Sequence, residues 1–99
     1  MIRANFLPDF WIDVVESAEW FDEQRRDLGR EFVAAVDAAI DKVLENPHAY
    51  RTVATPTRRF IIKRFQQLVF YEAEAENVLF LGVVHGSREV NRWLQRRRG

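Results

Sequence analysis

Apolar side chains recur along this chain with two different periods, and the change falls near residue 58. Before it, they recur every three or four positions, with acidic residues between them, which is typical of amphipathic helices. The first predicted helix carries Trp11, Val14, Val15, Ala18, Phe21 and Leu28 on its apolar side. The second carries Phe32, Val33, Val36, Ala39, Ile40, Val43 and Leu44.

The boundaries of these helices are marked by residues with special backbone preferences. Pro8 and Asp9 suit a first helical turn, since proline lacks the N–H that would be unpaired there and a carboxylate favours the positive end. Gly29 is expected to stop the first helix with a positive φ, and Asn46-Pro47 to stop the second. The connection is short, so the two helices should pack antiparallel as a hairpin with an acidic outer face.

The remaining segments predict strands. Residues 2–7 alternate in polarity, and residues 59–65, 68–72 and 78–84 are rich in β-branched and aromatic side chains. Short turns near Gln66-Gln67 and at 74–77, where Asn77 tolerates a left-handed backbone, imply an antiparallel meander. We treat residues 48–57 as a connecting loop. The helical hairpin is the available cover for the sheet, which predicts one α+β domain over residues 1–99, in the order β-α-α-β-β-β with a short basic C-terminal tail or helix.

Composition narrows the class of protein. The chain has no cysteine, which excludes disulfides and thiolate chemistry and suits a reducing cytosol. Neither a signal-peptide core nor an apolar run of transmembrane length is present. We therefore expect a cytoplasmic protein without membrane contact.

The net charge of zero conceals two oppositely charged halves. Residues 1–49 hold five Lys/Arg against eleven Asp/Glu, a net charge of −6, whereas residues 50–99 hold ten against four, a net charge of +6. The basic half could meet nucleic acid or an acidic protein. Equally, the two halves could simply neutralise each other across a solvated surface.

Candidate catalytic chemistry is sparse. His48 and His85 lack companions at metal-ligand spacing, and we expect neither a metal nor a cofactor. His85 follows the last predicted strand, where basic residues gather, so it could transfer a proton in a metal-independent nuclease. The simpler interpretation, which we favour, is that His85 caps the strand and hydrogen-bonds a neighbouring carbonyl. Trp93 is interpreted as an anchor that packs the tail on the sheet.

Short motifs in a fixed order resemble a known family. They are Ala18-Glu19-Trp20-Phe21-Asp22-Glu23-Gln24, Leu28-Gly29-Arg30-Glu31-Phe32, Glu45-Asn46-Pro47-His48-Ala49-Tyr50, Arg58-Arg59-Phe60-Ile61-Ile62-Lys63-Arg64-Phe65, Val69-Phe70-Tyr71, Val84-His85-Gly86-Ser87-Arg88 and Arg92-Trp93. Together they resemble the ParE branch of the RelE/ParE toxins of bacterial type II toxin–antitoxin systems. The resemblance covers nearly the whole chain and implies the same α+β fold.

The resemblance also implies a partner and a target. RelE-like members cleave mRNA on the ribosome, whereas ParE-like members inhibit DNA gyrase; both are neutralised by a cognate antitoxin in a hetero-oligomer. Gln67 stands where RelE-like toxins place a catalytic arginine, and Trp93 stands near their C-terminal tyrosine, which favours the ParE branch. The chain departs from the common pattern at Glu89-Val90, where relatives often have Asp-Pro, and at Gln66-Gln67.

Two sets of site residues follow from these alternatives. The gyrase inhibitor would contact its target through Arg64, Arg88, Arg92 and Trp93 and would have no catalytic residue. The alternative, a ribosome-dependent mRNA endonuclease, would use Arg58, Lys63, Arg64, His85 and Arg88. A third possibility is a non-toxic homologue that binds only an antitoxin.

Overall fold

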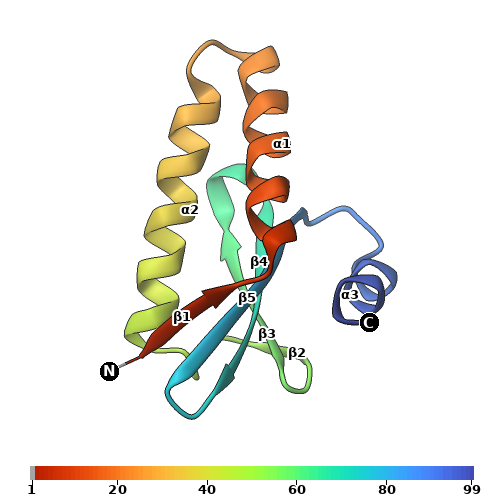
Figure 1. The fold of residues 1–99 in the computed structure, drawn as a ribbon. Helices are drawn as coiled ribbons and strands as arrows, with labels where there is room; N and C mark the ends of the chain where they lie inside the picture. Colours follow the sequence, from red (N-terminus) through yellow and green to blue (C-terminus); the bar gives the residue numbers. More distant parts are fainter. Residues whose placement is uncertain (1) are drawn as a thin grey trace.

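The computed structural model describes residues 2–99 and contains two layers with a third, smaller element beside them (Figure 1). In chain order the helices and strands are β1 (Arg3–Phe6), α1 (Pro8–Gln24), α2 (Leu28–Glu45), β2 (Thr52–Ala54), β3 (Thr57–Ile62), β4 (Gln67–Glu74), β5 (Asn77–His85) and α3 (Val90–Arg98). A short 3-10 turn, η1 (Lys63–Phe65), lies between β3 and β4.

The five strands form one sheet in the order β1-β5-β4-β3-β2. β1 pairs with β5 in parallel, and all other neighbours are antiparallel. The predicted α+β class and the helical hairpin on a mainly antiparallel sheet are therefore confirmed. Strand β2 was not predicted: it has three residues, too few for its polarity pattern to stand out within the segment 48–57.

The main core lies between the hairpin and one face of the sheet. Phe10 of α1, Phe32 of α2 and Phe80 of β5 are each 0% exposed. Ring centroids of Phe10 and Phe80 are 5.7 Å apart, so α1 packs directly on β5. Burying a side chain of this size stabilises the fold by roughly 1.5–3 kcal/mol.

A second apolar cluster lies beneath α3. It joins Leu94 to Leu68, Phe70 and Leu81 of the sheet, with Trp93 packed at its margin. The rings of Trp93 and Phe70 are 5.4 Å apart. The predicted C-terminal helix and the anchoring role of Trp93 are thus confirmed.

The buried side of α1 differs from the predicted one. Phe10, Val14 and Phe21 face the core, whereas Trp11 and Val15, both placed on the apolar stripe by the sequence, are 40% and 56% exposed. Phe10 packs against both Phe6 and Phe80, which rotates Trp11 toward solvent. The outer side of α1 therefore carries large apolar side chains as well as acids.

The turn between the helices is built differently from the prediction. Gly29 does not end α1; it lies in the first turn of α2, without a positive φ. Asp27 takes the left-handed conformation instead, with φ 66°, as aspartate can at modest cost. In the later turn, Ala75 rather than Asn77 has the positive φ.

Tyr71 provides a prediction about stability at alkaline pH. Its hydroxyl donates a 2.7 Å hydrogen bond to the Pro47 carbonyl, and burial raises the pKa of the phenol to about 12. The folded state therefore disfavours the phenolate, and this stabilisation is complete below the ordinary pKa of about 10 and is lost as the pH rises toward 12. We expect Tyr71→Phe to lower the free energy of unfolding at pH 7 by about 1 kcal/mol and to flatten its decline above pH 10.

Urea denaturation at a series of pH values measures both effects. Tyr50→Phe is the matched control, since Tyr50 is only partly buried and packs edge-on against Phe60. If the free energy of unfolding declined equally steeply above pH 10 in the wild type and in Tyr71→Phe, the raised pKa of Tyr71 would be contradicted.

Candidate functional site

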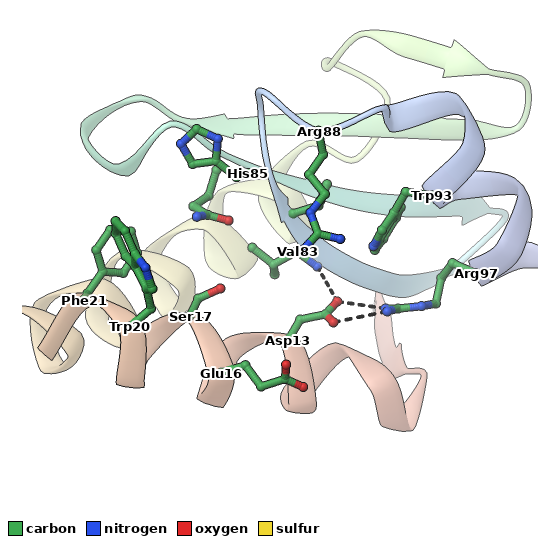
Figure 2. Close-up of a pocket in the computed structure, with 12 residues that line it drawn as sticks. Asp13, Glu16, Ser17, Trp20, Phe21, Val83, His85, Arg88, Trp93 and Arg97 are labelled. Atoms are coloured by element: carbon green, nitrogen blue, oxygen red, sulfur yellow. Dashed lines mark hydrogen bonds and ion pairs between the residues drawn. The ribbon is translucent and has the colours of Figure 1, made fainter. Parts of the chain in front are cut away.

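A groove of about 630 Å³ lies where α1, the end of β5 and α3 meet (Figure 2). Trp20 and Ser17 border it on the α1 side, and His85 and Arg88 border it where β5 ends. Trp93 lies at the α3 end. The groove thus gathers groups from both ends of the sequence.

An ion pair between Asp13 of α1 and Arg97 of α3 closes one end of this groove. Arg97 donates two hydrogen bonds to the carboxylate, Nη1 to Oδ2 at 2.8 Å and Nη2 to Oδ1 at 3.1 Å. Both side chains are largely sheltered, at 14% and 16% exposure. The hydrogen bond to Asp13 raises the pKa of Arg97, so the guanidinium stays charged.

The same two side chains also satisfy backbone groups of β5. The Val83 N–H donates to Asp13 Oδ2 at 2.9 Å, and Arg97 Nη1 donates to the Leu81 carbonyl at 2.8 Å. The guanidinium lies 4.6 Å from the centroid of the Trp93 ring, a cation–π contact. Asp13 and Arg97 therefore join three elements at one point.

Gly82 makes room for this cluster. A Cβ on Gly82 would lie 2.5 Å from Asp13 Oδ2 and 2.7 Å from the Trp93 ring, and would also meet Arg97 Nη1. Asp13, Gly82 and Arg97 were not among the site residues predicted from the sequence. A glycine inside an apolar strand was the available signal, because such a residue often marks close approach by another group.

His85 is exposed and held by its own turn. The Ser87 N–H donates to His85 Nδ1 at 3.1 Å, and the Ser87 hydroxyl lies 2.7 Å from the same nitrogen. Nδ1 is therefore an acceptor, and the neutral ring carries its proton on Nε2. The expected capping role holds, but the partners are the amide and hydroxyl of Ser87 rather than a carbonyl.

The predicted target-binding residues fall into two groups. Arg88 and Trp93 border the groove, and Arg92 is exposed on α3 beside Trp93. Arg64 lies on η1, where it forms an ion pair with Glu31. Hydrogen bonds from Arg64 and Arg25 lower the pKa of Glu31, which keeps the carboxylate charged.

The alternative nuclease residues are not gathered in one place. Of the five, only His85 and Arg88 border the groove. Arg58 donates to the carbonyls of His48 and Tyr50, at 3.2 Å and 2.8 Å, and so holds the connection between α2 and β2. Lys63 and Arg64 are exposed on η1. Within residues 2–99, the groove is lined by the aromatic rings of Trp20 and Trp93 and by Arg88, for which the described residues provide no ion-pair partner.

Comparisons with known proteins place the fold and the family. The model of the ParE toxin family, described as the ParE toxin of the type II toxin–antitoxin system parDE, matches residues 12–90. The chain belongs to the ParE toxin family. This confirms the family inferred from the sequence, over most of the chain and including the groove residues Asp13 and Arg88.

The fold of this ParE-family chain is similar to a solved structure described as a chromosomal ParDE toxin–antitoxin system from P. aeruginosa. The TM-score is 0.66 at 12% sequence identity, with 86% of this chain and 96% of the other covered. At this identity the likeness concerns the fold alone. A comparison with curated protein sequences gave no match. None of the helices within residues 2–99 combines the length and apolarity needed to cross a membrane.

Proposed function

We propose that this ParE-family protein is a toxin that inhibits DNA gyrase by direct protein contact and is neutralised by a cognate antitoxin in the cytoplasm. The observation that carries the proposal is the groove bordered by Arg88 and Trp93, which offers a binding surface. The groove is also lined by the partly buried Trp93 indole and the buried Gln67 amide. By the sequence resemblance, these two residues stand where a RelE-like nuclease would need a proton carrier and an arginine. Neither group changes its charge near neutral pH.

We assign target contact to Arg88, Arg92 and Trp93, with Arg64 as a peripheral member. Arg88 is the strongest candidate because it is exposed, borders the groove and forms no ion pair with any of residues 2–99. An arginine of this kind costs little stability when removed but can contribute about 2 kcal/mol to an interface. Arg64 would have to exchange Glu31 for the target, which reduces the binding it can contribute.

The experiment follows macromolecular synthesis after expression without antitoxin. Thymidine incorporation should fall first while methionine incorporation persists, and the purified protein should inhibit supercoiling by gyrase. Arg88→Ala should weaken that inhibition at least tenfold with an unchanged thermal midpoint. Arg26→Ala is the matched control, since Arg26 is exposed near the tip of the hairpin.

Each other outcome selects a different function. Codon-dependent mRNA cleavage within minutes would indicate that the target is the ribosome and not gyrase, and would support the nuclease alternative. Growth without inhibition, together with a stable antitoxin complex, would indicate a non-toxic homologue.

A further inference from the structure

The outward side of α1 carries a group of large apolar side chains that remain exposed within residues 2–99. Trp11 is 40% exposed, Ile12 52% and Val15 56%. Val15 lies three residues after Ile12 and four after Trp11, so the three side chains adjoin one another on the helix surface. They form what is called here the outer apolar patch. A solitary exposed apolar residue is ordinary, whereas a contiguous group on one helix is typical of a surface that meets a partner.

The outer apolar patch lies outside the groove described above. From α1, the groove is lined by Asp13, Glu16, Ser17, Trp20 and Phe21. The main core is reached from α1 by Phe10, Val14 and Phe21. Ile12, Val15 and Glu19 recur at steps of three and four residues and therefore form a third stripe of the same helix. None of the three patch residues lines the groove.

Helix α2 shows that exposed positions of this hairpin do not need large apolar side chains. Its exposed residues are Arg30, Ala34, Asp37, Ala38, Asp41, Lys42 and Glu45. Each is charged or is alanine, as expected for a helix face in water. Because α1 and α2 belong to one hairpin, the apolar outer side of α1 requires a cause that applies to α1 alone.

Trp11 is held in place by its neighbours. Its ring centroid lies 5.2 Å from that of Phe6 and 5.0 Å from that of Phe10. The indole therefore has a fixed position while part of it stays exposed, so it would lose little conformational freedom on binding. Tryptophans are enriched among the residues that contribute most to binding at interfaces. Ile12 and Val15 extend the apolar surface around this anchor.

The charges around the patch indicate what kind of surface fits it. Glu16, Glu19 and Glu23 are exposed on α1, and none of them forms an ion pair with any of residues 2–99. The sequence of α1 contains no lysine or arginine. A symmetric contact with a second copy would bring these carboxylates together, and like charges across an interface disfavour it. The patch instead fits a surface with an apolar centre and lysine or arginine around it.

We propose that the outer apolar patch is a contact surface for DNA gyrase, additional to the groove. For the identity of the partner, the proposal rests on the proposed function. An enzyme that holds DNA presents lysine and arginine to the phosphates, so gyrase offers a basic surface of the required kind. Trp11, Ile12 and Val15 pack on its apolar part, and Glu19 pairs with a cation beside it. Glu16 lies between the patch and the groove, so one target surface can cover both.

The test measures supercoiling by purified gyrase in the presence of the full-length chain. Ile12→Gln combined with Val15→Gln removes apolar surface and retains residues that form helices well. The double variant should raise the concentration needed for half inhibition at least tenfold, with an unchanged thermal midpoint of the free chain. Its affinity for the product of the adjacent open reading frame, measured by titration calorimetry, should stay within twofold of the wild type.

Ile61→Gln is the matched control for the double variant. Ile61 is 41% exposed and lies on β3, outside the patch. The substitution removes a comparable apolar side chain from a different part of the surface. It should change the inhibition of gyrase less than twofold.

A charge reversal tests the acidic side of the patch and keeps the proposal falsifiable if the double variant folds poorly. Glu19→Lys should weaken inhibition at least fivefold, because it places a cation against a basic surface. The difference from the wild type should shrink as the salt concentration rises from about 50 to about 200 mM, since salt screens exposed charges. Glu74→Lys is the matched control: Glu74 is exposed at the end of β4, and its reversal should change inhibition less than twofold.

The outcomes separate this proposal from the function on which it rests. Full inhibition of gyrase by the folded double variant or by Glu19→Lys overturns the contact surface and leaves the proposed function intact. An equal loss of antitoxin affinity assigns the patch to the antitoxin, and a wild-type dimer that the double variant dissociates assigns it to a second copy; either result overturns the proposal. A wild-type chain that does not inhibit gyrase overturns the proposed function and this contact with it.

Discussion

Asp13→Ala is expected to lower the free energy of unfolding by about 3 kcal/mol, because it breaks a sheltered ion pair by removing one partner. Arg97 would keep its charge at 14% exposure without the carboxylate that now accepts two of its hydrogen bonds. The Val83 N–H would lose its acceptor as well. The cost falls mainly on the docking of α3, so Trp93 fluorescence should change at lower urea concentration than the far-UV circular dichroism.

Three variants separate the contributions at this point. Glu16→Ala, one turn further along α1 and exposed, should change the free energy of unfolding by less than about 0.5 kcal/mol. Asp13→Asn keeps an acceptor for Val83 and should cost an intermediate amount. Asp13→Leu combined with Arg97→Met should recover much of the loss, since an apolar pair replaces two charges. A fully stable Asp13→Ala protein would show that the ion pair does not hold α3.

The sequence predicted the layers of this fold because each layer has a distinct period. Burial of one side of α2 produces its three- and four-residue apolar spacing, and burial of β5 produces its apolar run. Each pattern can be recognised within the sequence of the element itself. The side of α1 was less well defined, because adjacent aromatic residues, Phe10 and Trp11, compete for the core. β2 has three residues and owes its place to pairing with β3, which no local pattern records.

The candidate site was predicted in part for a similar reason. Arg88, His85 and Trp93 were found because they directly follow a buried strand, so their position at the end of the sheet follows from the strand itself. Asp13 and Arg97 are 84 residues apart in the chain. Each belongs to a helix whose charged residues are all predicted from the sequence pattern to be exposed to solvent. Their contact depends on how α1 and α3 approach the same strand from its two faces.

Gly29 illustrates how an expected turn residue can serve packing instead. The aspartate before α2 takes the left-handed conformation, and the glycine lets the two helices approach closely. Its N–H donates to Asp22 Oδ1 at 2.7 Å, joining the end of α1 to the start of α2.

Gly29→Ala is therefore expected to destabilise the chain by about 2 kcal/mol, even though alanine favours helices over glycine by about 1 kcal/mol. The added Cβ would lie 2.7 Å from Asp22 Oδ1 and would also meet the backbone carbonyl oxygen of Ala18, which cannot rotate away. The helices would have to separate, which lengthens the Gly29–Asp22 bond as well. Gly86→Ala is the matched control, because its Cβ would lie 3.4 Å from the Gln66 oxygen, an ordinary contact. Its free energy of unfolding should stay within about 0.5 kcal/mol of the wild type. A Gly29→Ala midpoint at or above that of Gly86→Ala would mean that the hairpin tolerates the extra methyl group and that Gly29 is not needed for its packing.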